Sequence, residues 1–262
     1  MSRPAKLRLS PTRIATFLAC RAMYKYDYID RIGRFYHKAR PGNSFGATLH
    51  QALRDFHVAG GAAAESADTL AQRAQGAWRS AGYEDAAQEQ RYRALAGDIL
   101  RGYHAAEAAK AGATRLFLAE KQISVDMGEF VLTGRVDRID EHTADGALEI
   151  VDYKSGRETV TPEDVAEALA MSVYQLILKK IYPERRVMAT IHALRSGQSA
   201  TSEMSAERLA AWEDEVRDIG RRILETDWES ALPVYIDDVC PNCDFLRLCG
   251  RYWRAHPEPE LG

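Results

Sequence analysis

Three strand-like segments follow one another between residues 116 and 155, and this run constrains the fold more than any other feature of the sequence. The segments read LFLAEKQISV, EFVLTGRVDRID and ALEIVDYKS, and short polar or glycine-containing turns separate them. They are rich in β-branched and aromatic residues, as strands are, and short connections join strands that are neighbours in a sheet. The run therefore predicts a three-stranded meander.

Helical patterns surround this meander on both sides. Ser10 followed by Pro11 is typical of a helix start, and apolar residues then recur at helical spacing. The same spacing predicts the remaining helices, and a last strand is predicted at 187–195. The expected helices span residues 11–28, 44–57, 66–81, 87–109, 162–181 and 209–223.

We therefore expect one α/β domain over residues 1–262, in which helices flank a mixed sheet. Its helical N-terminal part would cover 1–112, the sheet core 113–200, and a C-terminal helix with a cysteine-rich tail 201–262. No apolar run approaches the roughly 20 residues of a membrane span, and the first residues lack a secretory pattern. The expectation is a cytoplasmic protein without membrane contact.

The net charge of −3 excludes a chain that attracts nucleic acid over its whole surface. Any DNA-binding surface must then be local. One basic cluster stands out, but such a run is more often a solvated face. Its members are Arg31, Arg34, His37, Lys38 and Arg40.

The meander places a pair of carboxylates and a lysine on one side of the sheet. Because side chains alternate along a strand, Asp152 and Lys154 share a face that Glu149 does not, and Asp137 lies on the corresponding face of the preceding strand. If the two strands form a hairpin, Asp137 and Asp152 approach each other. Two close carboxylates require a proton or a cation between them.

A divalent ion such as magnesium or manganese meets that requirement with few oxygen ligands, and Lys154 could act on a water or a phosphate beside it. The competing interpretation is an ordinary salt bridge between Asp152 and Lys154, and the strand alone does not decide between them. His50 is a further candidate ligand, because Gly46 lies four residues earlier on the same helical face and leaves room for a close approach. A lone helical histidine is more often a satisfied polar residue.

The four cysteines have the spacing of a metal site. Cys240 and Cys243 form a tight chelating loop, Cys249 adds a third thiol, and Cys20 comes from the far end of the chain. Disulfides are not expected in the cytoplasm. Four thiolates suit zinc or an iron–sulfur cluster equally well.

Taken in order, these motifs resemble the RecB-like branch of the PD-(D/E)xK nuclease superfamily. The resemblance covers nearly the whole chain, from the segment LSPTRIATFLAC to the C-terminal cysteines. Glu120 stands where that branch often has an acidic residue. The matching motifs are Gly46 to His50, Gly134 to Asp137, Asp152-Tyr153-Lys154, and Tyr174-Gln175.

The resemblance implies a restriction-endonuclease-like sheet core and hydrolysis of DNA phosphodiester bonds with Mg²⁺ or Mn²⁺. By position, the metal ligands would be His50, Asp137, Asp152 and the carbonyl of Tyr153, while Lys154 acts on the attacking water. It also implies that Cys20, Cys240, Cys243 and Cys249 hold a [4Fe-4S] cluster, which we expect to be structural. The branch usually has a glutamine four residues before the tyrosine of the next helix, where this chain has Ala170. Either Gln175 takes over the contact of that glutamine with the substrate, or the contact is altered. Tyr174 and Gln175 are the catalytic candidates on this helix.

The resulting hypothesis is a DNA exonuclease acting on single strands or strand ends in repair, recombination or defence. One alternative is a nuclease that trims DNA for CRISPR adaptation. Another is a non-catalytic DNA-binding partner of a helicase, although the intact acidic pair and lysine argue against it. A weaker alternative is a zinc-ribbon-like regulator.

Overall fold

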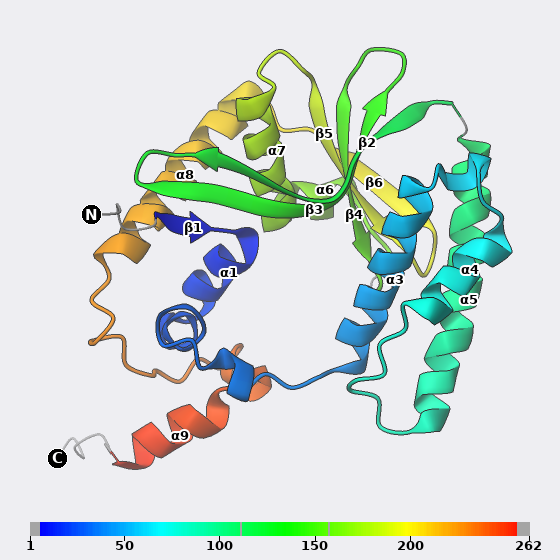
Figure 1. Ribbon diagram of the computed structural model, residues 1–262. Helices are drawn as coiled ribbons and strands as arrows, with labels where there is room; N and C mark the ends of the chain where they lie inside the picture. The colour runs from blue at the N-terminus through cyan, green and yellow to red at the C-terminus, as the bar shows by residue number, and fades with distance from the viewer. Residues whose placement is uncertain (1–5, 111, 157, 256–262) are drawn as a thin grey trace, which may run out of the picture.

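The computed structural model describes residues 6–110, 112–156 and 158–255 (Figure 1). A six-stranded mixed sheet forms the centre of this described part, and helices cover both of its faces. This architecture confirms the predicted fold class, and the meander appears as three consecutive antiparallel strands. The strands are β1 (Leu7–Leu9), β2 (Thr114–Asp126), β3 (Phe130–His142), β4 (Leu148–Lys154), β5 (Val187–Ala193) and β6 (Gln198–Ser202).

The long strand β3 organises the sheet. β2 pairs with one of its edges along nearly its whole length. The other edge is shared: β1 pairs in parallel with Phe130–Leu132, and β4 pairs antiparallel with Arg138–Glu141. No described strand pairs with the stretch 133–137 on that edge, so β3 and β4 diverge just beyond Arg138. β5 then continues the sheet parallel to β4, and β6 follows antiparallel.

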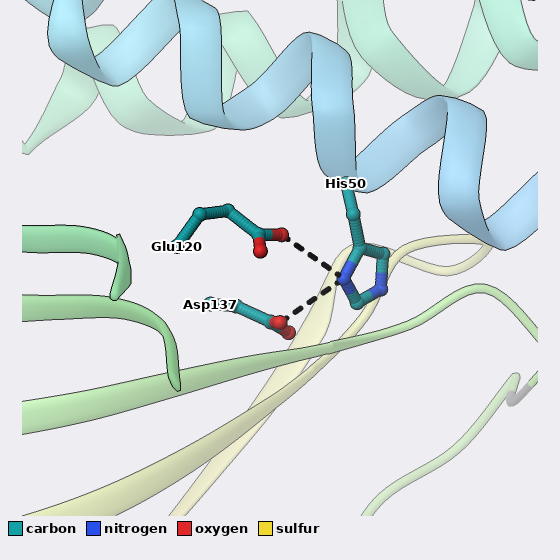
Figure 2. A group of neighbouring side chains, drawn as sticks. All are labelled: His50, Glu120 and Asp137. Atoms are coloured by element: carbon teal, nitrogen blue, oxygen red, sulfur yellow. Dashed lines mark hydrogen bonds and ion pairs between the residues drawn. The ribbon is translucent and has the colours of Figure 1, made fainter. Parts of the chain in front are cut away.

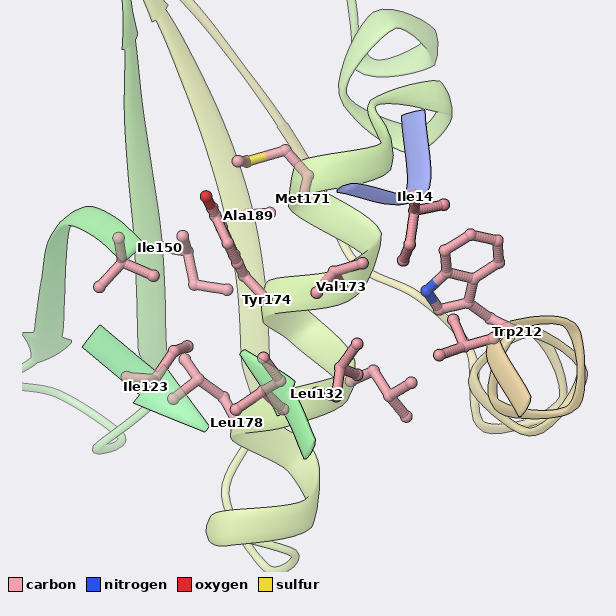
Figure 3. Packing of buried hydrophobic residues seen from close by; sticks show 14 of the residues in the cluster. Ile14, Ile123, Leu132, Ile150, Met171, Val173, Tyr174, Leu178, Ala189 and Trp212 are labelled. Atoms are coloured by element: carbon pink, nitrogen blue, oxygen red, sulfur yellow. The ribbon is translucent and has the colours of Figure 1, made fainter. Parts of the chain in front are cut away.

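The helices divide into two groups, one on each face. The first face carries α1 (Pro11–Ala19), α7 (Leu169–Ile181) and α8 (Ala206–Glu225). Figure 3 shows Tyr174 of α7 between Val173 and Ile150 of the sheet, with Ile14 and Trp212 on the far side of Val173. The second face carries α3 (Pro41–Val58), α4 (Ala67–Gly76) and α5 (Ala86–Ala109). Because neighbouring residues of β4 enter opposite clusters, this strand is buried on both sides.

The predicted helix at 11–28 is interrupted in the structure. Cys20 has an extended backbone, with φ −163° and ψ 121°, and its sulfur accepts a hydrogen bond from the Met23 N–H. Cys20 therefore lies between two helices and caps the second, rather than lying on one helix as expected. The chain continues as α2 (Arg21–Tyr24), a π-helical turn at Lys25–Ile29 and a 3₁₀ turn at Gly33–Phe35.

The predicted helix at 162–181 is also divided, into α6 (Pro162–Glu167) and α7, because Ala168 is extended with ψ 111°. Three short elements were not predicted: β1, β6 and α9 (Leu246–Ala255). Two further 3₁₀ turns lie at Gly61–Ala63 and Cys240–Asn242. Every helix in the described ranges is too short or too polar to cross a membrane.

Candidate metal centre

Three potential metal ligands from different elements converge in the space between α3 and the sheet (Figure 2). They are His50 on α3, Glu120 on β2 and Asp137 on β3, and one ligand atom of each lies within 4.8 Å of the others. His50 Nδ1 is 3.1 Å from Asp137 Oδ1 and 3.8 Å from Glu120 Oε1. Two carboxylates and an imidazole at this spacing can bind a divalent cation.

Helix α3 brings His50 to the sheet because its apolar stripe is buried against the second face. Gly46, one turn before His50, lies against the end of β4, where an added β-carbon would be 3.1 Å from Ser155 Oγ. A β-carbon there would require the Ser155 hydroxyl to shift by a few tenths of an ångström. Gly46 therefore permits a close contact between α3 and the residue that follows β4, while the predicted close approach of a ligand to His50 stays a prediction. The stripe consists of Phe45, Leu49, Leu53 and Phe56.

Glu120 reaches the same place through an unusual backbone conformation. Ala119 pairs with Arg138 and Lys121 with Val136, so Glu120 lies opposite Asp137 in the register. Its φ of 46° falls in the left-handed region, which costs a non-glycine residue about 1–3 kcal/mol and occurs often at functional sites. The Glu120 carboxylate also accepts a hydrogen bond from Arg135 Nε at 2.7 Å.

Asp152 lies beside this group, one step past the last paired residues of β3 and β4. The register places it opposite Asp137, on the same face of the sheet, as strand alternation predicted. Burial and the charge of Asp137 raise the pKa of the Asp152 carboxyl, although the Lys154 ammonium opposes this shift. Lys154 Nζ is 2.6 Å from Asp152 Oδ2. The salt bridge between Asp152 and Lys154 is therefore present. It lies beside the pair of carboxylates, Asp137 and Asp152, that together require a cation.

Hydrogen bonds around Asp137 and His50 show that the centre attracts positive charge. Asp137 Oδ2 accepts from the backbone N–H of Tyr153, where the strands separate. His50 faces acceptors at both nitrogens, with Nε2 3.0 Å from the Tyr153 carbonyl. Burial lowers the pKa of His50, but the bond to Asp137 and the charges of three carboxylates outweigh it and raise the pKa. Protonated histidine can donate at both positions.

Tyr174 on α7 lies against the glycine of the G-x-x-D motif. A β-carbon at Gly134 would overlap the Tyr174 ring, so only glycine permits this contact. The Tyr174 hydroxyl donates to the Arg135 carbonyl at 2.9 Å. Burial, and then the charges of Asp152 and Asp137, raise the pKa of Tyr174. Tyr174 therefore lies within electrostatic reach of the centre, while its catalytic role stays a prediction.

Gln175 occupies a different environment. Its side chain is 1% exposed, and its amide oxygen accepts a hydrogen bond from the Met204 N–H at 3.0 Å. Ala170, at the position where the resembled branch has glutamine, packs against the core of the first face. In this conformation Gln175 supports the connection after β6, and its predicted contact with substrate stays a prediction.

A buried polar network lies next to the centre, where α3 and α5 cover the same two strands. Arg138, next to Asp137, donates from Nη1 to the Tyr103 hydroxyl at 2.6 Å and to Glu107 at 3.0 Å, and its Nη2 is 2.9 Å from Asp140 Oδ2. The Tyr103 hydroxyl also bonds that of Tyr153 at 2.9 Å. The network ties α5 to the strands that carry the acidic pair.

His57 on α3 completes this network. Burial and the neighbouring Arg138 charge lower the pKa of His57 to about 2, so the ring is neutral and accepts from Arg138. Because His57 and His50 are two turns apart on the same helix, α3 is attached to the strands at both points. Sequence reasoning set His57 aside, and no spacing in the sequence indicates the network.

The four cysteines gather at one end of the molecule. Burial and then the nearby charges of the other three raise the pKa of Cys249 to about 11, although a hydrogen bond with Tyr26 opposes the shift. Cys243 is likewise raised, by burial and by Cys20 and Cys240. Segments 220 positions apart in the sequence therefore meet here, and Figure 1 shows the orange-red segment before α9 beside the blue turns that follow α1.

Comparison with known proteins agrees with this geometry. A family model described as the PD-(D/E)XK nuclease superfamily matches residues 8–250. No curated protein matches the chain. Among solved structures, one titled "Crystal structure of SSO0001" is 12% identical, with a TM-score of 0.38, and the match covers 95% of this chain and 89% of that one. That likeness is too remote to support an argument about the site.

Proposed function

The chain belongs to the PD-(D/E)XK nuclease superfamily, and from that premise we propose that it is a metal-dependent DNA exonuclease that acts on single strands or strand ends. The convergence of His50, Glu120 and Asp137 carries the proposal, because it supplies a cation site next to Asp152 and Lys154. The preference for ends is supported by the resemblance to the RecB-like branch. DNA is then the partner of the site.

The donor set fits a hard divalent cation. We propose that the centre holds Mg²⁺ or Mn²⁺ through His50, Asp137, Asp152, the Tyr153 carbonyl and, in addition to the ligands expected from the sequence, Glu120. When bound, the ion lowers the pKa of a water molecule and offsets charge on the phosphate.

The side chains around the ion have separate tasks in this proposal. Lys154 is 41% exposed at its side chain, so its ammonium is accessible and can donate to a water or to a phosphate oxygen. Asp137 also accepts a hydrogen bond from the Tyr153 N–H, which links β3 to β4. This link keeps the carboxylates of Asp137 and Asp152 close enough to bind one ion. The hydrogen bonds of Tyr103 with Arg138 and Tyr153 attach these strands to α5.

A cleavage assay tests the function. Protein purified without oxygen is incubated with end-labelled single- and double-stranded DNA, with Mg²⁺, with Mn²⁺ or with a chelator. We expect short products from linear single strands with either metal, none with chelator, and resistance of circular single strands. Absence of cleavage with both metals would contradict the proposal, and cleavage of the circle would correct it from exonuclease to endonuclease.

We also propose that the cysteine group holds a [4Fe-4S] cluster. The donor set consists of four thiols. Burial and the charges of neighbouring sulfurs raise the pKa of both Cys249 and Cys243, so the thiols lie close to one another. Such a cluster would join the start of α2 to the C-terminal segment. It would also stabilise the folded chain, because it binds the folded chain and not the unfolded one.

Replacing Cys243 by serine is expected to give colourless protein with a lower thermal midpoint, because one thiolate ligand is lost. Iron and sulfide content and visible absorption measure the effect, with about four of each per chain expected in the parent protein. Asn242→Ser, at the exposed neighbouring position, is the matched control and should stay brown. Zinc in place of iron in the parent protein would overturn the cluster assignment.

A further inference from the structure

A groove of about 900 Å³ separates the first helices from the C-terminal cysteine segment. One wall comes from α1, the π-helical turn and the residues that follow it, and the other from the segment 242–245. The groove belongs to neither the metal centre nor the buried network. Its polar lining includes Thr12, Thr16, Arg31, Arg34, Arg40 and Asn242.

The charges lining the groove leave an excess of cations. Asp27 is 2.7 Å from His37 Nε2, and Asp244 is 2.6 Å from Arg40 Nη2, so each acid already has a partner. Arg31 and Arg34 have no acidic partner in the described residues. In a chain of net charge −3, this local excess is the kind of surface that binds a polyanion.

An exposed aromatic ring lies at the edge of these cations. Phe35 is 71% exposed, which is unusual for phenylalanine, and the guanidinium of Arg34 lies 4.6 Å from the centre of its ring. The cation covers one face of the ring and leaves the other available. Aromatic rings beside a cationic groove are the feature with which proteins stack the bases of single-stranded nucleic acid.

The backbone holds this surface in a fixed shape. The π-helical turn Lys25–Ile29 is followed by Arg31 with φ 57°, a conformation that non-glycine residues rarely adopt. Gly33 then packs so closely on Asp27 that a β-carbon there would overlap the carboxylate. The backbone that carries Arg31 and Arg34 is therefore part of a tightly packed segment.

The groove and the metal centre lie along the same helix, α3. Arg40 is the residue that precedes α3, and His50 follows ten residues later on that helix. At 1.5 Å per residue, the two are about 15 Å apart along the helix axis. A polymer bound beside Arg40 would therefore lie at the N-terminal end of α3, the helix that carries the proposed metal ligand His50.

We propose that this groove binds single-stranded DNA, with its phosphates at Arg31 and Arg34 and one base stacked on Phe35. A strand is favoured over a duplex because a base inside a duplex has no free face to offer the ring. The inference rests on the proposed function for the identity of the polymer. It assigns a role to the basic cluster that the sequence alone favoured as a solvated face.

Binding without cleavage tests this inference. A labelled oligothymidylate is titrated with the full chain in chelator, by fluorescence anisotropy, and the thermal midpoint of each variant is measured alongside. Phe35→Ala is expected to weaken binding by about 5- to 150-fold, the range for loss of one stacked base, without a change in the midpoint. Val58→Ala, which trims another exposed apolar side chain, is the control and should bind as the parent does.

The cations are tested by salt dependence. Arg31→Gln together with Arg34→Gln should reduce the slope of log affinity against log salt by about 0.7 for each lost phosphate contact. Arg91→Gln, an exposed arginine on α5, should leave the slope unchanged. Unaltered affinity in Phe35→Ala with an unaltered slope in the double variant would overturn the inference, as would duplex or RNA bound more tightly than single-stranded DNA.

The two proposals fail separately. A chain that binds the oligonucleotide through Phe35 but cleaves nothing in either metal supports the groove and contradicts the nuclease. A chain that cleaves, yet binds equally well with and without Phe35 and the two arginines, supports the nuclease and contradicts the groove.

Discussion

Replacing Asp152 by asparagine is expected to lower the rate of DNA cleavage by roughly three orders of magnitude, the effect of several kcal/mol of lost transition-state stabilisation. The amide keeps the shape of the side chain but removes the charge that, with Asp137, requires a cation. The fold should persist. Because burial raises the Asp152 pKa in the folded chain, the ionised group lowers stability increasingly as the pH rises through that pKa, and asparagine removes this cost.

The measurement combines cleavage rates with thermal midpoints in the presence and absence of Mn²⁺. In the parent protein the ion should raise the midpoint, since it binds the folded chain, and in Asp152→Asn this increase should shrink. Asp145→Asn, in the exposed turn between β3 and β4, is the matched control and should behave as the parent. Parent-like cleavage by Asp152→Asn would remove Asp152 from the site.

Replacing Arg138 by methionine is expected to lower the free energy of unfolding by about 3–5 kcal/mol, the usual effect of removing one partner of a buried ion pair. Asp140 would then be left in a region of low polarity without its cation, and Glu107 would keep only its ion pair with the exposed Lys110. Burial already raises the pKa of Asp140 to about 6, despite the opposing charge of Arg138.

Urea unfolding measures the lost free energy of unfolding, and this loss should depend on pH. The deficit of Arg138→Met should be largest at high pH and should decrease as the pH falls and the Asp140 carboxyl, whose pKa burial raises to about 6, takes up a proton. Arg115→Met removes an ion pair of similar length to Glu141 at the surface, where the expected cost is below about 1 kcal/mol. Equal losses in the two variants would show that the network does not stabilise the strands.

The sequence predicted the parts of the fold that rest on local rules. Strand alternation and short turns are local, so the meander and the shared face of Asp137 and Asp152 followed from them, and the mixed sheet was confirmed. His50 was singled out because Gly46 is one turn away, and the structure places it against Asp137. Whether these residues perform the predicted roles stays a prediction.

The remaining parts depend on information that no local pattern contains. Glu120 lies opposite Asp137 only in the actual register, which shifts between Leu116 and Leu118, and its left-handed backbone follows from no propensity. The short strands β1 and β6 are defined by their pairing rather than by their composition. Arg138 and Tyr103 are 35 positions apart, so their contact could not be inferred without the fold.

The groove beside the cysteines has walls from opposite ends of the sequence, and this fixes the order in which a growing chain can complete its parts. All six strands of the described residues leave the ribosome before Cys240 does, and Cys20 precedes Cys240 by 220 positions. At about 5–20 residues per second, roughly 10–40 s of synthesis separate the two walls. A nascent chain thus acquires every strand of its sheet, and every residue of its candidate metal centre, before its groove exists.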